Sequence, residues 1–420
     1  MKTESRPFDP IQESNEYNPV HLDEADWLLE LFRQTVARGA SDLHLRVPNS
    51  PVMRVDGEVE CQRDLSPLSA EDVDRAFACI ATPEQVEAFH REMELDFSID
   101  VPMLARFRVN ALRQRGTTSL AFRVVPFSVP TIDGLGLPHV FKTLALKRRG
   151  LILVTGSTGT GKSTTLAAMI DYINENCGRN IITIEDPIEY VHPSKRSIIA
   201  QRSLGSDTKS FSGALLHALR HDADTIVIGE IRDLDTINTA MMAAETGHLV
   251  LGTLHTVDAV RSIDRLVDLC PADERGQLRM RLSQVIEAIT AQMLLPRIGG
   301  GRVAAFEILV ANGATRDIIR ENRTSELPRN MECSSKEEGM QTFNQSLMEL
   351  VKTGMISRQE AIARSNDPVK LKNRLAELPA PPKGADAAAP GPRAEPWYLR
   401  DVLSFLPKNA AGAATNSVQT

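Results

Sequence analysis

The chain has 420 residues, of which 42% are hydrophobic and 25% are charged, a balance typical of globular proteins with two or three domains. Its net charge of −7 argues against a protein whose whole surface binds nucleic acid. The first ten residues lack the apolar core of a secretory signal, and no apolar stretch approaches the roughly 20 residues that span a bilayer. Five cysteines without a C-x-x-C pair argue against structural zinc and favour a reducing compartment. We therefore expect a cytoplasmic protein without a transmembrane segment.

The first third of the chain predicts an α+β domain over residues 21–127, preceded by a polar segment, 1–20, that we expect to be disordered. Apolar residues at helical spacing indicate helices, while alternating runs and a Val-Asp-Gly-Glu hairpin signal indicate strands. The predicted helices are 22–37, 69–80 and 83–91, and the predicted strands are 41–47, 52–59, 95–99, 105–112 and 118–124. Prolines and glycines then predict a linker over residues 128–148.

Residues 149–375 have a different pattern of predicted elements, in which short apolar strands alternate with longer helices. That alternation predicts an α/β domain built on a parallel sheet with helical crossovers. Its predicted strands are 151–154, 180–184, 225–228 and 249–254, followed by a hairpin of 289–296 and 302–309 and by helices over 341–352 and 358–363. The Pro/Ala-rich segment 376–420 is expected to be a disordered tail with an apolar cluster at 397–406.

A glycine-rich octamer stands between the first of these strands and a helix predicted over 163–176. It has the pattern G-x-x-x-x-G-K-S and consists of Gly156, Ser157, Thr158, Gly159, Thr160, Gly161, Lys162 and Ser163. In such a phosphate loop the backbone N–H groups point at phosphate oxygens, the lysine reaches the β- and γ-phosphates and the hydroxyl holds Mg²⁺. A flexible turn is the alternative, which the flanking strand and helix disfavour. The octamer predicts that ATP and Mg²⁺ bind here.

Carboxylates follow two of the other predicted strands. Glu230 comes after 225–228, with Gly229 in place of the aspartate that usually precedes the Walker B glutamate, and Glu185, Asp186 and Glu189 come after 180–184. Carboxyl ends of parallel strands are where α/β proteins place their sites, so these groups could orient the attacking water and surround the metal. A surface salt bridge or a solvated acidic turn is the alternative reading.

Two kinds of cationic group complete the candidates. His248 and His255 flank the strand 249–254, which we expect to place them at one sheet edge or its approach, where an imidazole could contact the γ-phosphate. Ordinary polar caps are the alternative. In the N-terminal domain Arg106 and Arg108 share one face of a strand and Arg123 lies in another strand. In a ring such arginines could serve a neighbouring subunit as arginine fingers, or they could form a solvated basic face or contact RNA.

The motifs occur in the order found in the ATPases that drive type IV pili and type II secretion. Segment 185–189 resembles their Asp box, 228–233 their atypical Walker B motif and 245–256 their His box. Within that group the chain resembles the pilus retraction ATPases, PilT and PilU, over segments 40–45, 314–321 and 339–343, although Thr315 and Asp317 depart from the PilT pattern. The missing tetracysteine metal site argues against most extension and secretion ATPases. The tail, residues 317–320 and Phe343 favour the PilU type.

The resemblance covers about residues 23–371 and implies a PAS-like N-terminal domain joined to a RecA-like P-loop ATPase domain in a homohexamer. It implies ATP hydrolysis that powers pilus retraction at the inner face of the inner membrane, with a platform protein and a PilT paralogue as partners. The implied catalytic residues are Lys162, Glu189, Glu230, His255, Arg108 and Arg123. Further expected nucleotide contacts are Thr164, Arg232 and His248, and the expected metal ligands are Ser163, Glu185, Asp186 and Glu230.

Three other functions stay open at this point. The protein could be a nucleotide-gated scaffold that supports another retraction ATPase, a pilus-assembly or secretion ATPase, or a DNA translocase, which the acidic charge balance disfavours. The 397–406 cluster could dock on a partner or pack on the ATPase domain of its own chain.

Overall fold

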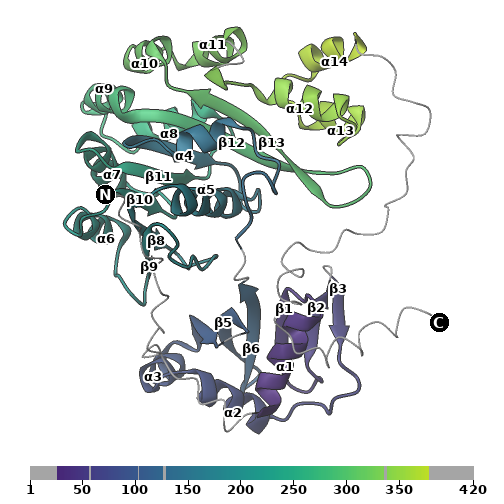
Figure 1. The fold of residues 1–420 in the computed structure, drawn as a ribbon. Helices are drawn as coiled ribbons and strands as arrows, with labels where there is room; N and C mark the ends of the chain where they lie inside the picture. Colours follow the sequence, from purple (N-terminus) through teal and green to yellow (C-terminus); the bar gives the residue numbers. More distant parts are fainter. Residues whose placement is uncertain (1–25, 56–57, 103, 126–128, 335–337, 378–420) are drawn as a thin grey trace, which may run out of the picture. The chain divides into compact units, whose positions relative to one another are not determined.

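A computed structural model describes residues 26–55, 58–102, 104–125, 129–334 and 338–377 of the chain (Figure 1). The predictions for residues 1–20, for the start of the first helix and for the tail from residue 378 on lie outside these ranges. The chain divides after residue 127 into an N-terminal unit and a second unit, which are described separately below. The second unit is called the ATPase unit, after the domain that the sequence predicts there. Within the described residues, no helix combines the length and the apolar character that crossing a bilayer requires.

The N-terminal unit is a six-stranded antiparallel sheet with the strand order β3-β2-β1-β6-β5-β4. Its strands are β1 (Asp42–Arg46), β2 (Val52–Val55), β3 (Glu58–Cys61), β4 (Glu94–Val101), β5 (Ala105–Gln114) and β6 (Thr117–Val125). Its helices are α1 (Asp26–Ala37), α2 (Ala70–Ile80) and α3 (Pro83–Glu92). The predicted hairpin is confirmed, because Val55 of β2 lies opposite Glu58 of β3.

Buried apolar residues alternate with more exposed residues along the strands, so one face of this sheet forms a core. In β5 the residues Ala105, Phe107, Val109 and Ala111 are buried, and the residues between them are more exposed. Apolar residues of all three helices join them in one core, in which the ring of Phe32 on α1 stacks on Phe107 at 4.4 Å between centroids. The opposite face of β5 and β6 is therefore free for polar side chains.

The ATPase unit contains a seven-stranded sheet in the order β13-β12-β7-β11-β10-β8-β9. All neighbouring pairs are parallel except β12 with β13. The strands are β7 (Gly150–Thr155), β8 (Asn180–Glu185), β9 (Ile198–Ser203), β10 (Thr225–Ile228), β11 (Leu249–Leu254), β12 (Ile286–Pro296) and β13 (Arg302–Val310). Every residue of β7, β10 and β11 is buried, as expected for central parallel strands covered on both faces.

Helices cover both faces of this sheet. One face, which includes Ile152 and Val154 of β7, packs on α4 (Val140–Ala145) and α5 (Lys162–Asn176). The other face, which includes Leu151 and Leu153, packs on a larger group of helices. These are α6 (Phe211–Ala218), α7 (Leu234–Glu245), α8 (Ala259–Asp268), α9 (Arg275–Val285), α10 (Gly313–Arg320) and α11 (Leu327–Cys333).

The hairpin of β12 and β13 continues beyond the central strands and carries a small core of its own. Phe343 and Leu347 of α12 (Phe343–Lys352) pack there with Leu295 of β12. Helices α13 (Arg358–Arg364) and α14 (Pro368–Ala376) complete this group, which lies beside the hairpin in Figure 1.

The structure corrects two expectations for this unit. Residues 128–148, predicted as a linker, contain α4, whose Phe141 and Leu144 are buried in the sheet's core, so the described part of this segment belongs to the ATPase unit. The edge strand β9 is absent from the predicted strands, because its apolar residues are followed by Gln201, Arg202 and Ser203 and form no apolar run of strand length. This segment is a strand because its backbone pairs with β8, a long-range contact that the local sequence does not indicate.

The buried carboxyl group of Glu307 links the sheet to helix α8 by a hydrogen bond. Glu307 of β13 is 6% exposed, and its Oε1 accepts a hydrogen bond from the backbone N–H of Ala259, the first residue of α8, at 2.9 Å. Burial raises the pKa of Glu307 to about 7, although the Ala259 N–H partly opposes this shift. Between its ordinary value and pH 7, Glu307 therefore holds its proton in the folded protein but not in the unfolded chain.

We predict that this carboxyl group makes the protein less stable as the pH rises from about 4.5 to about 7, by an amount on the order of 3 kcal/mol. Glu307→Gln keeps an acceptor for Ala259 and removes the titration, so melting temperatures recorded from pH 5 to pH 8 should fall less steeply than in the wild type. The surface substitution Glu349→Gln is the matched control and should leave the slope unchanged. Parallel curves for wild type and Glu307→Gln would contradict the prediction.

Candidate active site

A cavity of about 500 Å³ opens at the carboxyl edge of the ATPase sheet. Parallel pairing sets Thr155 at the end of β7 opposite Leu254 at the end of β11, and Ile228 at the end of β10 opposite Ile184 of β8. The segments that follow these strands consequently emerge together. The predicted site residues that line the cavity are Thr158, Gly159, Gly161, Lys162, Ser163, Thr164, Glu185, Asp186, Glu189, Glu230 and His255.

The octamer after β7 forms a tight loop that leads into α5. Gly156, Gly159 and Gly161 have φ values of 147°, 81° and 90°, which side chains other than glycine rarely adopt. At Gly156 there is also no room, since a Cβ would lie 2.5 Å from Thr160 Oγ1. This backbone fits a phosphate cradle, in which successive N–H groups must turn inward at the start of a helix.

Lys162 lies at the first position of α5 and points back into the loop. Its Nζ donates to the carbonyl oxygens of Gly156 at 2.9 Å and Ser157 at 3.0 Å. Burial lowers the pKa of Lys162, while the charges of Glu230 and Glu189 act to raise it. Two carboxylates from different strands thus act on the ammonium that the loop holds.

Glu230, two residues beyond β10, is the centre of a small charged cluster. Its Oε2 lies 2.7 Å from a guanidinium nitrogen of Arg232 and 3.3 Å from Nε2 of His255, which follows β11. Burial raises the pKa of Glu230, but the hydrogen bond from Arg232 and the charges of His255 and Arg232 outweigh it, so the pKa lies below its ordinary value. The carboxylate is therefore ionised at neutral pH and can accept a proton or orient water.

Glu185 has a different environment from Glu230, although both line the cavity. Its Oε1 accepts hydrogen bonds from Thr183 at 2.7 Å and Gln201 at 3.0 Å, and its Oε2 faces the N–H of Glu189 at 3.4 Å. Burial raises the pKa of the Glu185 carboxyl group. These bonds hold Glu185 in the acidic turn formed by residues 185–189, and its assignment as a metal ligand stays a prediction.

The chemistry of the other expected donors fits Mg²⁺. Ser163 offers a hydroxyl beside the phosphate loop, Asp186 is an exposed carboxylate on the cavity wall, and Glu230 is ionised. Oxygen donors that leave room for waters and phosphate oxygens are the usual environment of Mg²⁺ next to a nucleotide.

The structure does not place His248 where we expected it. His248 precedes β11 and His255 follows it, so about 20 Å of strand separates them. His248 lies at the amino end of the parallel strands, and His255 lies at their carboxyl end, where the cavity opens. The Nδ1 of His248 lies 2.9 Å from the carbonyl oxygen of Ala243 in α7. The expectation that both imidazoles lie at one sheet edge or its approach is wrong, because the six residues of β11 carry the chain from the amino end of the parallel strands to their carboxyl end.

The two candidate arginines lie on the polar face of the N-terminal sheet. Arg108 of β5 is directly opposite Arg123 of β6 in the antiparallel register. Arg123 Nε donates to Asp42 Oδ1 at 2.9 Å, and Arg106 on the same face forms an ion pair with Asp100 at 3.2 Å. The unit thus presents Arg108 and Arg123 side by side.

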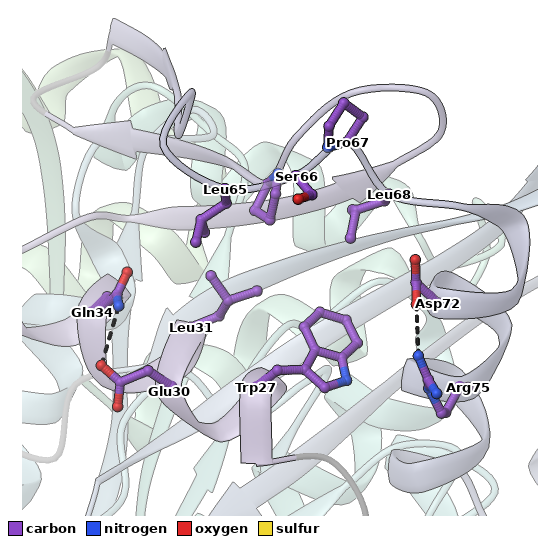
Figure 2. A pocket seen from close by; sticks show the side chains of 11 residues that line it. Trp27, Glu30, Leu31, Gln34, Leu65, Ser66, Pro67, Leu68, Asp72 and Arg75 are labelled. Carbon is purple, nitrogen blue, oxygen red and sulfur yellow. Dashed lines mark hydrogen bonds and ion pairs between the residues drawn. The ribbon is translucent and has the colours of Figure 1, made fainter.

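A second cavity, of about 310 Å³, lies within the N-terminal unit (Figure 2). Leu31 of α1 faces Leu65 of the loop after β3, and Trp27 lies between them and α2. A hydrogen bond from Gln34 to Glu30 and an ion pair of Asp72 with Arg75 border the apolar floor. The described residues that line this cavity include no part of the phosphate loop. The predicted catalytic residues Lys162, Glu189, Glu230 and His255 instead line the cavity of the ATPase unit.

Sequence reasoning missed several residues of the ATPase cavity. Tyr190 lies with its hydroxyl 2.9 Å from Thr164 Oγ1, and His192 is 7% exposed with its Nδ1 lacking a partner among the described residues. Both follow the acidic turn within a few positions, and this proximity was the available signal. Leu294 and Arg302 also line the cavity but come from the distant hairpin of β12 and β13, for which no local motif exists.

Gly229 has a structural reason for replacing the usual Walker B aspartate. Its N–H donates to the carbonyl oxygen of Ile184 at 2.7 Å, and a Cβ would lie 3.1 Å from that oxygen and 3.2 Å from Cα of Glu185. Any side chain at this position would therefore press on the end of β8.

We predict that Gly229→Ala lowers the free energy of unfolding by about 1–3 kcal/mol, the range for overpacked sites, as measured by denaturant titration. Gly276→Ala is the matched control, since a Cβ at Gly276 has nothing within 4 Å, and it should cost nothing. Equal stability of the two variants would contradict the close approach of β10 and β8.

Comparison with known proteins identifies the family of the chain. The family described as type II/IV secretion system protein matches residues 28–300. The type IV pilus retraction ATPase PilT of Pseudomonas aeruginosa is 46% identical over 81% of this chain and 98% of its own length, and PilU of the same organism is 41% identical over 82% and 90%. A crystal structure of the pilus retraction motor PilT with bound ADP superimposes with a TM-score of 0.78 and 44% identity, over 82% of this chain and 99% of that one.

These matches confirm the predicted fold class and the predicted resemblance to the pilus retraction ATPases. The family match spans more than half of the chain, and the relatives align over nearly their whole length. The chain therefore belongs to the type II/IV secretion family of ATPases, alongside PilT and PilU, and is an ATP hydrolase.

Proposed function

We propose that this protein is a motor that hydrolyses ATP to retract type IV pilus filaments. The observation that carries the proposal is the convergence of Lys162, Glu230 and His255, from three separate strand ends, on one cavity beside the phosphate loop. Its similarity to PilT, at 46% identity, and to PilU supports retraction rather than another use of the same chemistry.

Each residue has a physical role in this proposal. The loop amides and Lys162 neutralise the phosphates, and Ser163 with Asp186 and Glu230 would hold Mg²⁺, which supplies further charge neutralisation when bound. Glu230, ionised and positioned by Arg232 and His255, orients the attacking water and accepts its proton. Glu189 acts electrostatically on Lys162 and would add to the negative charge near a bound Mg²⁺.

We further propose a homohexamer in which Arg108 and Arg123 reach the nucleotide of a neighbouring subunit. Their side-by-side position on one sheet face would let both contact the γ-phosphate as it gains charge. The ring would work in the cytoplasm at the inner face of the inner membrane, on a platform protein of the pilus machine, together with a PilT paralogue if it is of the PilU type.

The two central residues should fail in different ways. Lys162→Ala is expected to abolish both ADP binding and hydrolysis. Glu230→Gln should retain ADP binding, because the loop amides and Lys162 hold the phosphates, and should lose at least about 100-fold in kcat, because the reaction depends on the Glu230 charge. Calorimetry and a phosphate-release assay measure the two properties. Glu245→Gln, which breaks an ion pair with Arg281 between α7 and α9, is the control and should keep its turnover. Near-normal turnover of Glu230→Gln would refute its assigned role.

Mixed rings test whether the arginines act between subunits. Protein carrying Arg108→Ala and Arg123→Ala, and protein carrying Lys162→Ala, should each be inactive alone. Mixed and allowed to reassemble, they should regain part of the turnover, since some interfaces then join an intact phosphate loop to intact arginines. Arg106→Ala, on the same sheet face, should stay close to wild type. Mixtures without any gain would contradict action in trans.

A non-motor scaffold and a DNA translocase are the competing functions. Turnover of the purified protein with and without a PilT-type partner separates the motor from the scaffold. Stimulation by DNA that falls with rising salt would instead indicate a translocase.

A further inference from the structure

We propose that Gln292 of β12 is a positioning residue that holds the phosphate loop in its nucleotide-binding shape. The proposal rests on the ATP-hydrolase activity and concerns a residue in none of the nucleotide motifs. Ala291 of β12 lies opposite Thr155, the last residue of β7, so Gln292 stands level with the point where the loop begins.

Gln292 contacts the loop at three of its positions. Its Nε2 donates to the carbonyl oxygen of Thr160 at 2.8 Å. Its backbone oxygen would lie 2.6 Å from a Cβ at Gly156, and its Nε2 would lie 3.3 Å from a Cβ at Gly161. The first and last glycines of the octamer are thus packed against this one residue, and Thr160, whose carbonyl it binds, lies between them in the sequence.

The side chain is buried, at 3% exposure, yet only half of its amide is used. Among the described residues Oε1 has no hydrogen-bond partner, and turning the amide over would bring Oε1 against the Thr160 carbonyl. A buried acceptor without a partner is unfavourable, so an apolar side chain of the same length would fill this space at lower cost. The contribution of the amide is therefore its donor, which is directed at the loop.

Holding the Thr160 carbonyl orders the loop before a nucleotide arrives. Without that bond the loop must lose conformational freedom when it closes on the phosphates, and binding becomes weaker. Since the same order is needed for substrate and for transition state, the loss should raise KM more than it lowers kcat.

Gln292→Met tests this, because methionine matches the length and removes the hydrogen bond. We expect ADP affinity, measured by calorimetry, to fall about tenfold, the scale of one hydrogen bond, with KM for ATP rising in step and kcat changing less. Gln341→Met is the matched control: Gln341 Nε2 also donates to a backbone carbonyl of the same hairpin, that of Phe306 at 3.1 Å, but lies outside the cavity wall. Its ADP affinity should equal that of the wild type.

Gln292→Glu decides the matter if Gln292→Met also lowers the melting temperature. A buried glutamate has a raised pKa, so lowering the pH from about 8 to about 5.5 should convert it to an acid whose O–H can donate to Thr160. ADP affinity of Gln292→Glu, divided by that of the wild type at the same pH, should then recover, while that of Gln292→Met should not.

Several results would overturn the proposal. ADP binding within twofold of wild type by Gln292→Met, or no recovery of Gln292→Glu at low pH, would refute the positioning role alone. Failure of the wild-type protein to bind ADP would overturn the ATPase activity as well, so the two failures are distinguishable.

Discussion

Parallel pairing of four strands is the constraint on which the active site depends. β7, β11, β10 and β8 are neighbours in the sheet but are separated along the chain by helical crossovers. Their parallel register brings the phosphate loop, His255, Glu230 and the acidic turn out at one edge. A slip of one residue in any pair would move side chains to the opposite face of the sheet and separate these groups. The close packing of both faces of the sheet against helices opposes such a slip.

Within that edge, the environment of each carboxylate determines what it can do. Glu185 is the last residue of β8, and Glu230 follows the adjacent strand β10. Both side chains line the cavity. Glu230 contacts Arg232 and His255, which together hold its pKa low. Glu185 instead accepts hydrogen bonds from the neutral donors Thr183 and Gln201, and burial raises its pKa. One carboxylate is consequently charged and available for catalysis, and the other stabilises the turn that carries Glu189 and Tyr190.

The phosphate loop is likewise shaped by more than its own glycines. Their positive φ values permit the curl, but the loop is also pressed against β12, a strand about 130 residues further along the chain. That strand pairs with β13, which carries Glu307 and packs on α12. The phosphate loop is therefore joined by direct packing to the hairpin, and through the hairpin to the C-terminal helices.

The sequence by itself determined the features that depend on neighbouring residues. The glycine pattern of residues 156–163, the hairpin at Val55 and Glu58 and the buried strands around residues 151, 226 and 250 were predicted because local periodicity and turn chemistry report directly on them. Only the tertiary structure decided which strand ends meet. It separated His248 from His255, placed α4 in the core where a linker was expected, and brought Gln292 to the loop. Those outcomes depend on pairing between distant segments, where the register of the sheet, rather than any local pattern, sets the distance between two side chains.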